Sequence, residues 1–283
     1  MTLEFLKAGT LEAALRALSG PGAAILSGGT DLMVKLRTGA AACEKLVDIS
    51  DVAELRQLNM AADRIVIGAA VPESEILASE AVCERLPLLE RALRSLGSSQ
   101  IRNRGTLGGN LVNASPAADG ALALLAYDAS VKLVSEQGER SLPVEQFLEG
   151  PGTTALRVGE LVQSIEIDLG KLPVASHVFF HKVGRRKAMT IAVASLGGWA
   201  VVERTTVRAI GMAVGSVAPT PLRLRSIEQE LVGCRLEATT ADVVRRNVSG
   251  MVAPIDDVRG TGEYRRQVVG ELAAQFITEL GDG

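Results

Sequence analysis

Residues 100–120 have the sequence QIRNRGTLGGNLVNASPAADG, which is rich in Gly, Asn, Ser and Pro and shows little periodicity. A stretch of this length without a helix or strand pattern, inside a compact domain, is usually functional or disordered. Apolar side chains are spaced through it at Ile101, Leu107, Leu111 and Val112. Because such side chains favour burial, the stretch is predicted to be an ordered loop with a function.

The centre of this loop is the segment GTLGGN at 105–110. Glycines there let the backbone approach a ligand closely and adopt positive φ, and successive N–H groups can form an anion nest. Asn110, Asn113 and Ser115 add side-chain donors, and Asp119 is placed to accept hydrogen bonds from a sugar-like hydroxyl. The alternative is a wide surface turn in which Asp119 caps the following helix.

A second glycine pair lies in ILSGGTDL at 25–32, where a strand is followed by a helix start. Free backbone N–H groups at a helix N-terminus favour a phosphate, and Thr30 adds a hydroxyl donor. Taken alone, the segment fits better a tight turn with Thr30 or Asp31 as N-cap. Neither a Rossmann fingerprint nor a P-loop is present. Two Gly-Gly-hydroxyl segments without a catalytic cluster nevertheless fit a dinucleotide with two phosphates better than one small anion.

The first part of the chain alternates helix and strand patterns around these two segments. Its expected helices are 11–18, capped by Thr10, then 87–96 and 121–127. Its expected strands are 23–26, 46–49, 64–69, 131–134 and 164–167.

A linker at 171–173 separates this part from the remainder. The remainder has strand patterns at 178–183, 191–202 and 209–217, and then helical patterns at 226–232, 240–248 and 264–280. Strands followed by helices predict an α+β domain, and a length of 283 residues favours two domains.

Charge and composition exclude several classes of protein. Lys plus Arg number 30 and Asp plus Glu 33, so the net charge is −3. A nucleic-acid-binding protein would need a basic face to neutralise phosphates, so no nucleic-acid partner is expected. Apolar residues make up 47% of the chain, which supports a sizeable core and argues against disorder.

The cysteines and the first residues bear on the compartment. Cys43, Cys83 and Cys234 are scattered, which suggests neither a disulfide framework nor an iron–sulfur or zinc cage. Glu4 and Glu12 stand where a signal peptide has uninterrupted apolar residues. No run approaches the roughly 18 apolar residues of a membrane span. These features predict a cytoplasmic protein without a membrane span.

The remaining polar clusters predict no catalytic residue and no metal. His177 and His181 would share one face of a strand, but no third ligand accompanies them. The chain has no other histidine and no Gly-x-Ser-x-Gly elbow, so a nucleophilic triad is not expected. The basic turn KVGRRK at 182–187 is either a solvated loop or a neighbour of an anionic cofactor.

Segments in a fixed order resemble the FAD-binding subunit of molybdenum hydroxylases, the family of the xanthine dehydrogenase and carbon monoxide dehydrogenase flavoproteins. They are LSGGTDL (26–32), QIRNRGTLGGNLVNASPAAD (100–119), LVQSIEI (161–167), FFHKVGRR (179–186) and GSVAPTPLR (215–223). The resemblance covers essentially the whole chain.

The resemblance implies an α+β fold. Two α/β subdomains clasp an extended FAD (a PCMH-type FAD-binding domain), and a C-terminal domain of a small antiparallel sheet plus helices follows. In this chain the FAD-binding domain would be 1–172, with subdomains at about 1–57 and 58–172. The C-terminal domain would be 173–283.

The resemblance also implies which residues hold the FAD. Backbone N–H groups and threonine hydroxyls in the two glycine segments would bind the pyrophosphate. Asp119 matches the family's acidic FAD contact, Val162 an apolar residue near the cofactor, and Lys182 the lysine close to the isoalloxazine. Ile101 would lie beside the flavin ring. The expected cofactor-binding residues are Ile25, Leu26, Ser27, Gly28, Gly29, Thr30, Asp31, Leu32, Ile101, Thr106, Gly108, Gly109, Asn110, Asp119, Val162 and Lys182.

The implied function is electron transfer within a dimer of heterotrimers. A large molybdopterin-binding subunit would hydroxylate an N-heterocycle, a purine or an aldehyde. A small 2Fe-2S subunit would pass the electrons to FAD on this chain, and NAD, a quinone or O2 would accept them. The cofactor carries this chemistry, which agrees with the absence of a catalytic cluster.

Two departures from relatives are visible. Leu96 stands where some relatives place an aromatic against the flavin, which leaves ring stacking open. The scattered cysteines exclude the four-cysteine iron–sulfur insertion of the branch similar to 4-hydroxybenzoyl-CoA reductase.

One alternative function is that of a stand-alone FAD-dependent oxidoreductase of the vanillyl-alcohol-oxidase-like fold, which would need its own Ser, Tyr or Glu acid beside the flavin. A non-enzymatic nucleotide-binding module is the other.

Overall fold

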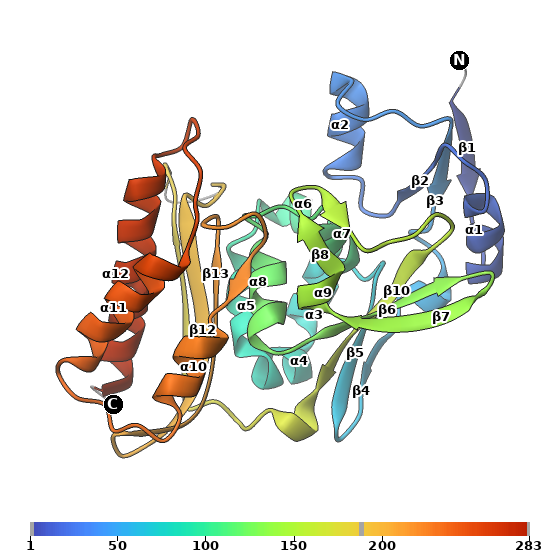
Figure 1. The fold of residues 1–283 in the computed structure, drawn as a ribbon. Coiled ribbons are helices and arrows are strands. Elements are labelled where there is room, and N and C mark those ends of the chain that lie inside the picture. Colours follow the sequence, from blue (N-terminus) through green and yellow to red (C-terminus); the bar gives the residue numbers. More distant parts are fainter. Residues whose placement is uncertain (1–2, 187–189, 282–283) are drawn as a thin grey trace.

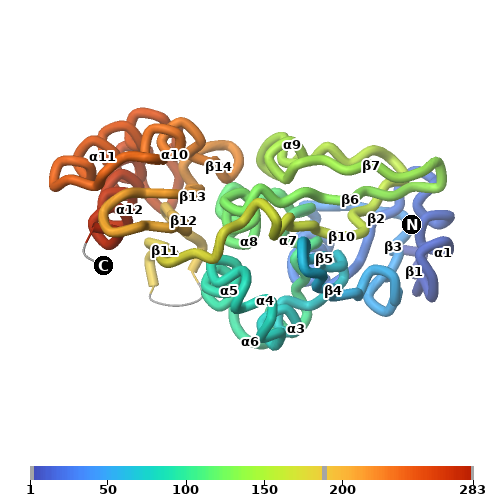
Figure 2. Tube along the Cα trace, turned by 90° about the horizontal axis from the view of Figure 1, so that it is seen from below, coloured from blue at the N-terminus to red at the C-terminus, as the bar shows by residue number. Residues whose placement is uncertain are grey.

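The computed structural model describes residues 3–186 and 190–281, whose strands form three main sheets in chain order. Figure 2 shows the three sheets with their helices in a row, the amino-terminal strands and the carboxy-terminal helices at opposite ends. The mixture of helices and sheets, with an antiparallel sheet in the last part, confirms the predicted α+β class.

The first sheet is parallel, in the order β1 (Glu4–Lys7), β3 (Lys45–Asp48) and β2 (Ala23–Leu26). Helix α1 (Leu11–Leu18) buries its apolar face against this sheet. It begins as predicted, because Thr10 Oγ1 accepts a hydrogen bond from the N–H of Ala13 at 3.2 Å. Helix α2 (Leu32–Thr38) has no buried residue and stands away from the sheet (Figure 1).

The second sheet is antiparallel, in the order β4 (Leu58–Met60), β5 (Arg64–Gly68), β10 (Leu161–Asp168), β6 (Ser130–Ser135) and β7 (Gly138–Pro143). Short helices and a two-stranded hairpin surround it. They are η1 (Ala53–Leu55), α3 (Glu73–Ala78), α4 (Glu80–Arg85), α5 (Pro87–Arg94), α6 (Ser99–Arg102), α7 (Leu107–Val112), α8 (Asp119–Ala126), α9 (Val144–Phe147), β8 (Leu148–Gly150), β9 (Thr153–Thr154) and η2 (Leu169–Lys171).

The third sheet is also antiparallel, in the order β11 (His177–Val183), β12 (Ala194–Glu203), β13 (Thr206–Gly215) and β14 (Leu222–Arg223). The helices that follow are α10 (Arg225–Leu231), α11 (Thr240–Met251) and α12 (Gly262–Gly281). Helices α11 and α12 cover one face of this sheet, and α5 and α8 cover the other (Figure 1).

Each of the three sheets, together with the helices that pack on it, forms one unit. Helix α8 joins the second and third units, and all of its residues are buried between them. The indole Nε1 of Trp199 on β12 donates a hydrogen bond to the carbonyl oxygen of Ala126 at 2.7 Å. A Cβ on Gly211 of β13 would lie 2.4 Å from the same oxygen, so only glycine permits this approach. One face of the third sheet therefore packs into the core of the second unit, while its other face forms a separate core with α10, α11 and α12.

Most of the predicted helices and strands are confirmed within a few residues, but the stretch 100–120 is not a loop. Helices α6 and α7 and the start of α8 lie in it. Ser98 and Thr106 cap α6 and α7 by accepting hydrogen bonds from the N–H groups of Ile101 and Gly109. These helices span one or two turns, which is too short for a periodic apolar pattern to show in the sequence.

Two further expectations about this stretch are wrong. Gly105, Gly108 and Gly109 do not have positive φ. Glycine is needed at Gly108 for close packing instead, because a Cβ there would lie 2.5 Å from the carbonyl oxygen of Ala69. Asp119 does not cap α8, since Ala118 is the N-cap and no side chain bonds to the helix start. None of the helices in 3–186 and 190–281 is long and apolar enough to cross a membrane.

Candidate functional site

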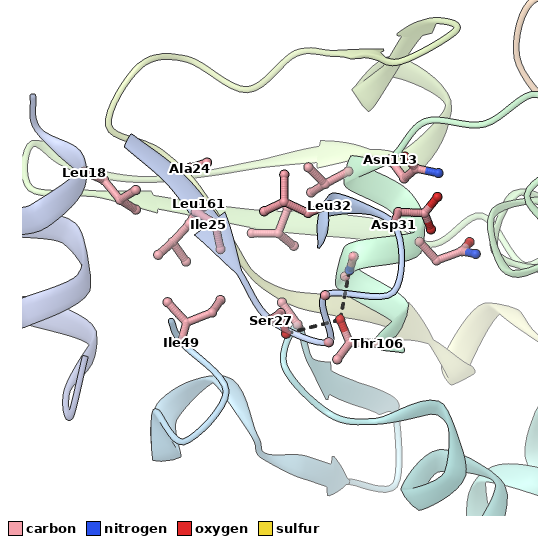
Figure 3. A pocket seen from close by; sticks show the side chains of 18 of the residues that line it. Leu18, Ala24, Ile25, Ser27, Asp31, Leu32, Ile49, Thr106, Asn113 and Leu161 are labelled. Atoms are coloured by element: carbon pink, nitrogen blue, oxygen red, sulfur yellow. Dashed lines mark hydrogen bonds between the residues drawn. The ribbon is translucent and has the colours of Figure 1, made fainter. Parts of the chain in front are cut away.

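A cleft of about 730 Å³ lies between the first and second units. On one side it is lined by the end of α1, strand β2 and the turn that leads into α2. On the other side it is lined by the segment before α7, by α7 itself and by the segment before β10 (Figure 3). Its volume is in the range of a site for a drug-sized ligand or cofactor.

The turn after β2 forms the first wall. A Cβ on Gly28 would lie 2.0 Å from the carbonyl oxygen of Arg104, so this position accepts only glycine. Gly29 has φ +74°, which glycine adopts without strain. The turn therefore runs directly against the segment that precedes α7, and the two glycine motifs come together in space.

The start of α7 forms the second wall. Thr106 is its N-cap, and Thr106 Oγ1 accepts a hydrogen bond from the N–H of Gly109 at 3.0 Å. Ser27 Oγ lies 3.4 Å from Thr106 Oγ1, so hydroxyls of both motifs meet at the cleft (Figure 3). The N–H groups of Gly109 and Asn110 donate to Thr106, so backbone donors for a ligand on this wall come from the residues before Gly109.

A cation bridges the two walls. Lys35 Nζ on α2 donates a hydrogen bond to Asn113 Oδ1 at the end of α7, at 2.5 Å. Both residues line the cleft, and Arg157 adds a second positive charge to the lining. Positive charge next to free backbone N–H groups favours an anionic ligand. No local pattern marks Lys35 as a site residue, because only the tertiary fold brings α2 against α7.

The rest of the lining is largely apolar, apart from the glycine motifs and the carboxyl groups of Asp31, Glu73 and Glu160. Leu18, Ala24, Ile25, Ile49 and Leu161 gather at the same end of the cleft (Figure 3). Leu96, Ile101 and Val162 also line the cleft, and among the described lining residues none is aromatic. An apolar cleft with a few convergent polar groups is typical of a cofactor site.

The structure brings most of the expected cofactor-binding residues into this lining, all except Leu26, Asp119 and Lys182. Lys182 Nζ forms a buried ion pair with Asp119 Oδ2 at 2.6 Å and donates to the carbonyl oxygen of Ser95 at 3.1 Å. Burial raises the pKa of the Asp119 carboxyl, and the ammonium of Lys182 opposes that shift. These two residues hold α8 to β11.

The basic turn at 182–187 begins at the end of β11, and none of its described residues, 182–186, lines the cleft. Arg185 Nη1 donates to the carbonyl oxygen of Val258 at 3.2 Å, and Lys187 lies outside the described residues. His181 stacks on Phe179 within the third sheet. No group of three or more His, Cys, Asp or Glu side chains with metal-binding geometry occurs in the part of the chain that the structure describes.

The cleft lining also contains a buried carboxylic acid, Glu73, that the sequence did not indicate as a site residue. Its side chain is 2% exposed, and its Oε2 has no hydrogen-bond partner among the described residues. Burial raises the pKa of Glu73 to about 7. No local pattern marks this residue, because its burial follows from packing of the segment around Gly105 over the start of α3.

Three features fit an extended dinucleotide such as FAD. The cleft has a volume of about 730 Å³ and is lined chiefly by the segments 18–35, 101–113 and 157–162. Its two glycine motifs pack against each other, so one ligand can contact both. Asn110 Oδ1 is buried and has no protein partner among the described residues. A buried polar group without a partner requires an explanation, which a bound cofactor supplies.

Two family models match the chain. The model described as "FAD binding domain in molybdopterin dehydrogenase" matches residues 1–168. The model described as "CO dehydrogenase flavoprotein C-terminal domain" matches residues 179–280. Together they cover nearly the whole chain.

Curated proteins and solved structures show the same similarity. The glyceraldehyde dehydrogenase medium chain of Sulfolobus acidocaldarius is 31% identical, over 98% of this chain and 97% of that one. The carbon monoxide dehydrogenase medium chain of Hydrogenophaga pseudoflava is 32% identical, over 91% and 89%. A solved carbon monoxide dehydrogenase from H. pseudoflava, which lacks the Mo-pyranopterin moiety, superimposes with a TM-score of 0.93 at 27% identity, over 98% and 96%.

Proposed function

The chain belongs to the family of FAD-binding subunits of molybdopterin dehydrogenases, and from that membership we propose that it carries electrons through FAD between two other components. A 2Fe-2S subunit delivers the electrons, and NAD, a quinone or O2 receives them. The cleft between the first two units carries this proposal. FAD, once bound, accepts electrons in pairs or singly, and the protein supplies position and electrostatics.

The two glycine motifs hold the pyrophosphate of FAD in this proposal. Ser27–Thr30 and Thr106–Asn110 lie side by side at the cleft and offer backbone N–H groups and hydroxyls. Lys35 on α2 bonds to Asn113 at the end of α7, and its positive charge next to the two motifs favours a phosphate. Ile101 and Val162 supply apolar contact for the flavin half. Leu26 serves as support from behind the lining, because its Cδ1 lies 2.9 Å from where a Cβ on Gly29 would be.

Asp119 and Lys182 act at the flavin end of the site in this proposal. Both sit next to residues that line the cleft, since Ser95, which contacts both, precedes the lining residue Leu96. Their charges neutralise each other in the ion pair. The pair therefore fixes the local electrostatic field beside the cofactor without adding net charge.

The partner subunits follow from the family. A large molybdopterin-binding subunit and a small 2Fe-2S subunit complete a heterotrimer with this medium chain, and two heterotrimers form a dimer. Relatives named for glyceraldehyde, xanthine and caffeine suggest that the large subunit hydroxylates an aldehyde, a purine or another N-heterocycle. The substrate is selected on that subunit, so this chain needs no substrate pocket of its own.

We also propose that the chain divides at 172/173 and works in the cytoplasm. The first two sheets end with β10 at Asp168, and the third begins with β11 at His177. The matched family segments change between 168 and 179. Within the first domain, the break near 57 falls between the parallel sheet and the antiparallel sheet. The free cysteines Cys43, Cys83 and Cys234 suit a reducing compartment.

The experiment is the visible absorption spectrum of the purified full chain, followed by release of the cofactor with acid. An oxidised-flavin spectrum and about one FAD released per chain are expected of a non-covalent cofactor site. A colourless chain that neither retains FAD nor takes it up on addition would overturn the proposal.

A second measurement separates the proposed function from a stand-alone oxidoreductase. The FAD-loaded chain is mixed with candidate substrates, alone and together with its two co-purified partner chains. Bleaching of the flavin only in the presence of the partners is expected. Steady turnover of a substrate by the chain alone would favour the stand-alone reading.

A further inference from the structure

Glu73 is an unsatisfied acid in the wall of the cleft. It lines the cleft at the start of α3, its side chain is 2% exposed, and its Oε2 lacks a hydrogen-bond partner among the described residues. A buried ionised carboxylate without a partner is strongly disfavoured, whereas a neutral carboxyl can donate one hydrogen bond. The carboxyl therefore needs either a proton or a ligand.

The carboxyl lies directly behind the glycine motifs. A Cβ on Gly105 would lie 3.3 Å from Glu73 Oε2, and the N–H of Glu73 donates to the carbonyl oxygen of Gly105 at 2.9 Å. The other side of this segment faces Gly28, whose missing Cβ would lie 2.9 Å from Gly105 Cα. The acid is thus adjacent to the two turns that hold phosphate in the proposed function.

The charged groups around Glu73 do not neutralise it. Arg102 on α6 favours the ionised form, but its guanidinium is occupied by the carbonyl oxygens of Leu96 and Gly97. Asp119 and Asp31 disfavour the ionised form, and the charge of Asp119 is compensated by Lys182. No lysine or arginine among the described residues forms an ion pair with Glu73.

We propose that Glu73 is a proton-linked contact of the FAD site, neutral when the cofactor is bound and donating its hydrogen to an oxygen of the cofactor. This inference rests on the proposed function, because it takes FAD as the occupant of the cleft. An ionised Glu73 would lie near the two negative phosphates of the cofactor, and its burial weakens the screening of that repulsion by solvent. Binding of FAD therefore requires that Glu73 keep or take up a proton.

Proton uptake predicts a specific dependence of affinity on pH. Burial already raises the pKa of Glu73 in the cofactor-free chain to about 7. The anionic cofactor raises that pKa further, so FAD binding takes up a proton in the pH range between 7 and the higher pKa of the FAD-bound state. The dissociation constant of FAD should then rise about tenfold between pH 6 and pH 8.

The test is the dissociation constant of FAD at a series of pH values, from fluorescence of FAD released on dilution of the loaded full chain. Glu73→Gln offers an N–H donor at every pH and should bind FAD at pH 6 within about threefold of the wild type. Its affinity should not change between pH 6 and pH 8. Glu75→Gln is the matched control on the same helix, since Glu75 is half-exposed and pairs with Arg56 outside the cleft.

Each outcome decides the proposal. A tenfold weakening in the wild type and in Glu75→Gln, but not in Glu73→Gln, supports it. An affinity independent of pH in the wild type, or the same weakening in Glu73→Gln, overturns it while leaving the FAD site in place. Failure of all three chains to bind FAD at any pH would overturn the proposed function instead.

Competition with ADP-ribose identifies the cofactor oxygen. Like FAD, ADP-ribose carries a pyrophosphate substituted at both ends, whose charge is constant between pH 6 and pH 8, but it lacks the flavin half. The same tenfold dependence for ADP-ribose in the wild type, and its loss in Glu73→Gln, assigns the hydrogen bond to the half that the two ligands share. Dependence for FAD without dependence for ADP-ribose assigns it to the flavin half, and both results support the proton-linked contact.

Discussion

Lys182 and Asp119 are 63 residues apart in the sequence and form an ion pair of 2.6 Å in which both side chains are at least nine-tenths buried. Lys182 comes from β11 of the third sheet and Asp119 from the first residue of α8. Ser95 contacts both residues. The pair therefore joins the matched FAD-binding segment to the matched C-terminal segment next to the cleft.

Lys182→Met should destabilise the chain strongly. It leaves the buried Asp119 carboxylate without a partner charge, and removing one member of a buried pair costs about 3–5 kcal/mol. The free energy of unfolding from denaturant titration measures this loss. Lys171→Met is the control, because Lys171 is 85% exposed in its ion pair with Asp168 and should cost less than about 1 kcal/mol. Equal losses in the two variants would contradict a structural role for the buried pair.

Gly108→Ala should impair both folding and FAD binding. The new Cβ would lie 2.5 Å from the carbonyl oxygen of Ala69 and 2.6 Å from its Cβ, so α7 must shift from the cleft wall. Overpacking of this kind costs about 1–3 kcal/mol. The ratio of FAD to chain after purification, together with denaturant unfolding, reports both effects. Gly9→Ala, where nothing lies within 4 Å of the new Cβ, should leave both values unchanged.

Thr106→Val tests whether a helix cap also serves the cofactor. The change removes the Oγ1 that accepts from the N–H of Gly109, and loss of such a cap costs about 1 kcal/mol. Thr10→Val removes an equivalent cap, on Ala13 at the start of α1. The two variants should lose similar stability, but only Thr106→Val should weaken FAD binding, by roughly tenfold for one lost hydrogen bond. FAD titration that shows equal affinities would remove Thr106 from the proposed phosphate contacts.

Glu73→Gln should stabilise the FAD-free chain in a pH-dependent manner. Burial raises the pKa of Glu73 from its ordinary value of 4.5 to about 7, so the folded state keeps the proton longer than the unfolded state does. The contribution of Glu73 to stability is full below pH 4.5 and is lost as pH rises to 7. The variant does not titrate there, so its advantage over the wild type should grow by about 2–3 kcal/mol between pH 5 and pH 8. A constant difference in the free energy of unfolding across this range would show that Glu73 is not held neutral.

Local patterns in the sequence were sufficient for many elements. Thr10 predicted the start of α1 because a cap depends on hydrogen bonds within one helical turn. The apolar spacing of 264–280 predicted α12 for the same local reason. The stretch 100–120 has no periodic pattern, because α6 and α7 are short and α7 is also glycine-rich, so both are stabilised by packing rather than by propensity.

The candidate site divides in the same way. The glycine motifs and their threonines were predicted from sequence, because clustered glycines next to a hydroxyl are visible as a local pattern; the structure adds that Gly28 and Gly108 have no room for a Cβ. Lys35 and Glu73, which also line the cleft, belong to no recognisable sequence pattern. A lysine on an exposed helix and a glutamate in a first helical turn are ordinary residues until the fold places them.

The α+β class, the two glycine motifs and the family to which they belong follow from the sequence. The contact of Ser27 with Thr106, 79 residues apart, and the ion pair of Asp119 with Lys182 follow only from the way the chain folds. The difference lies in the range of the interactions. Caps, turns and helical periodicity depend on neighbours within a few residues, whereas burial, ion pairing and the pKa of Glu73 depend on which distant segments the fold packs together.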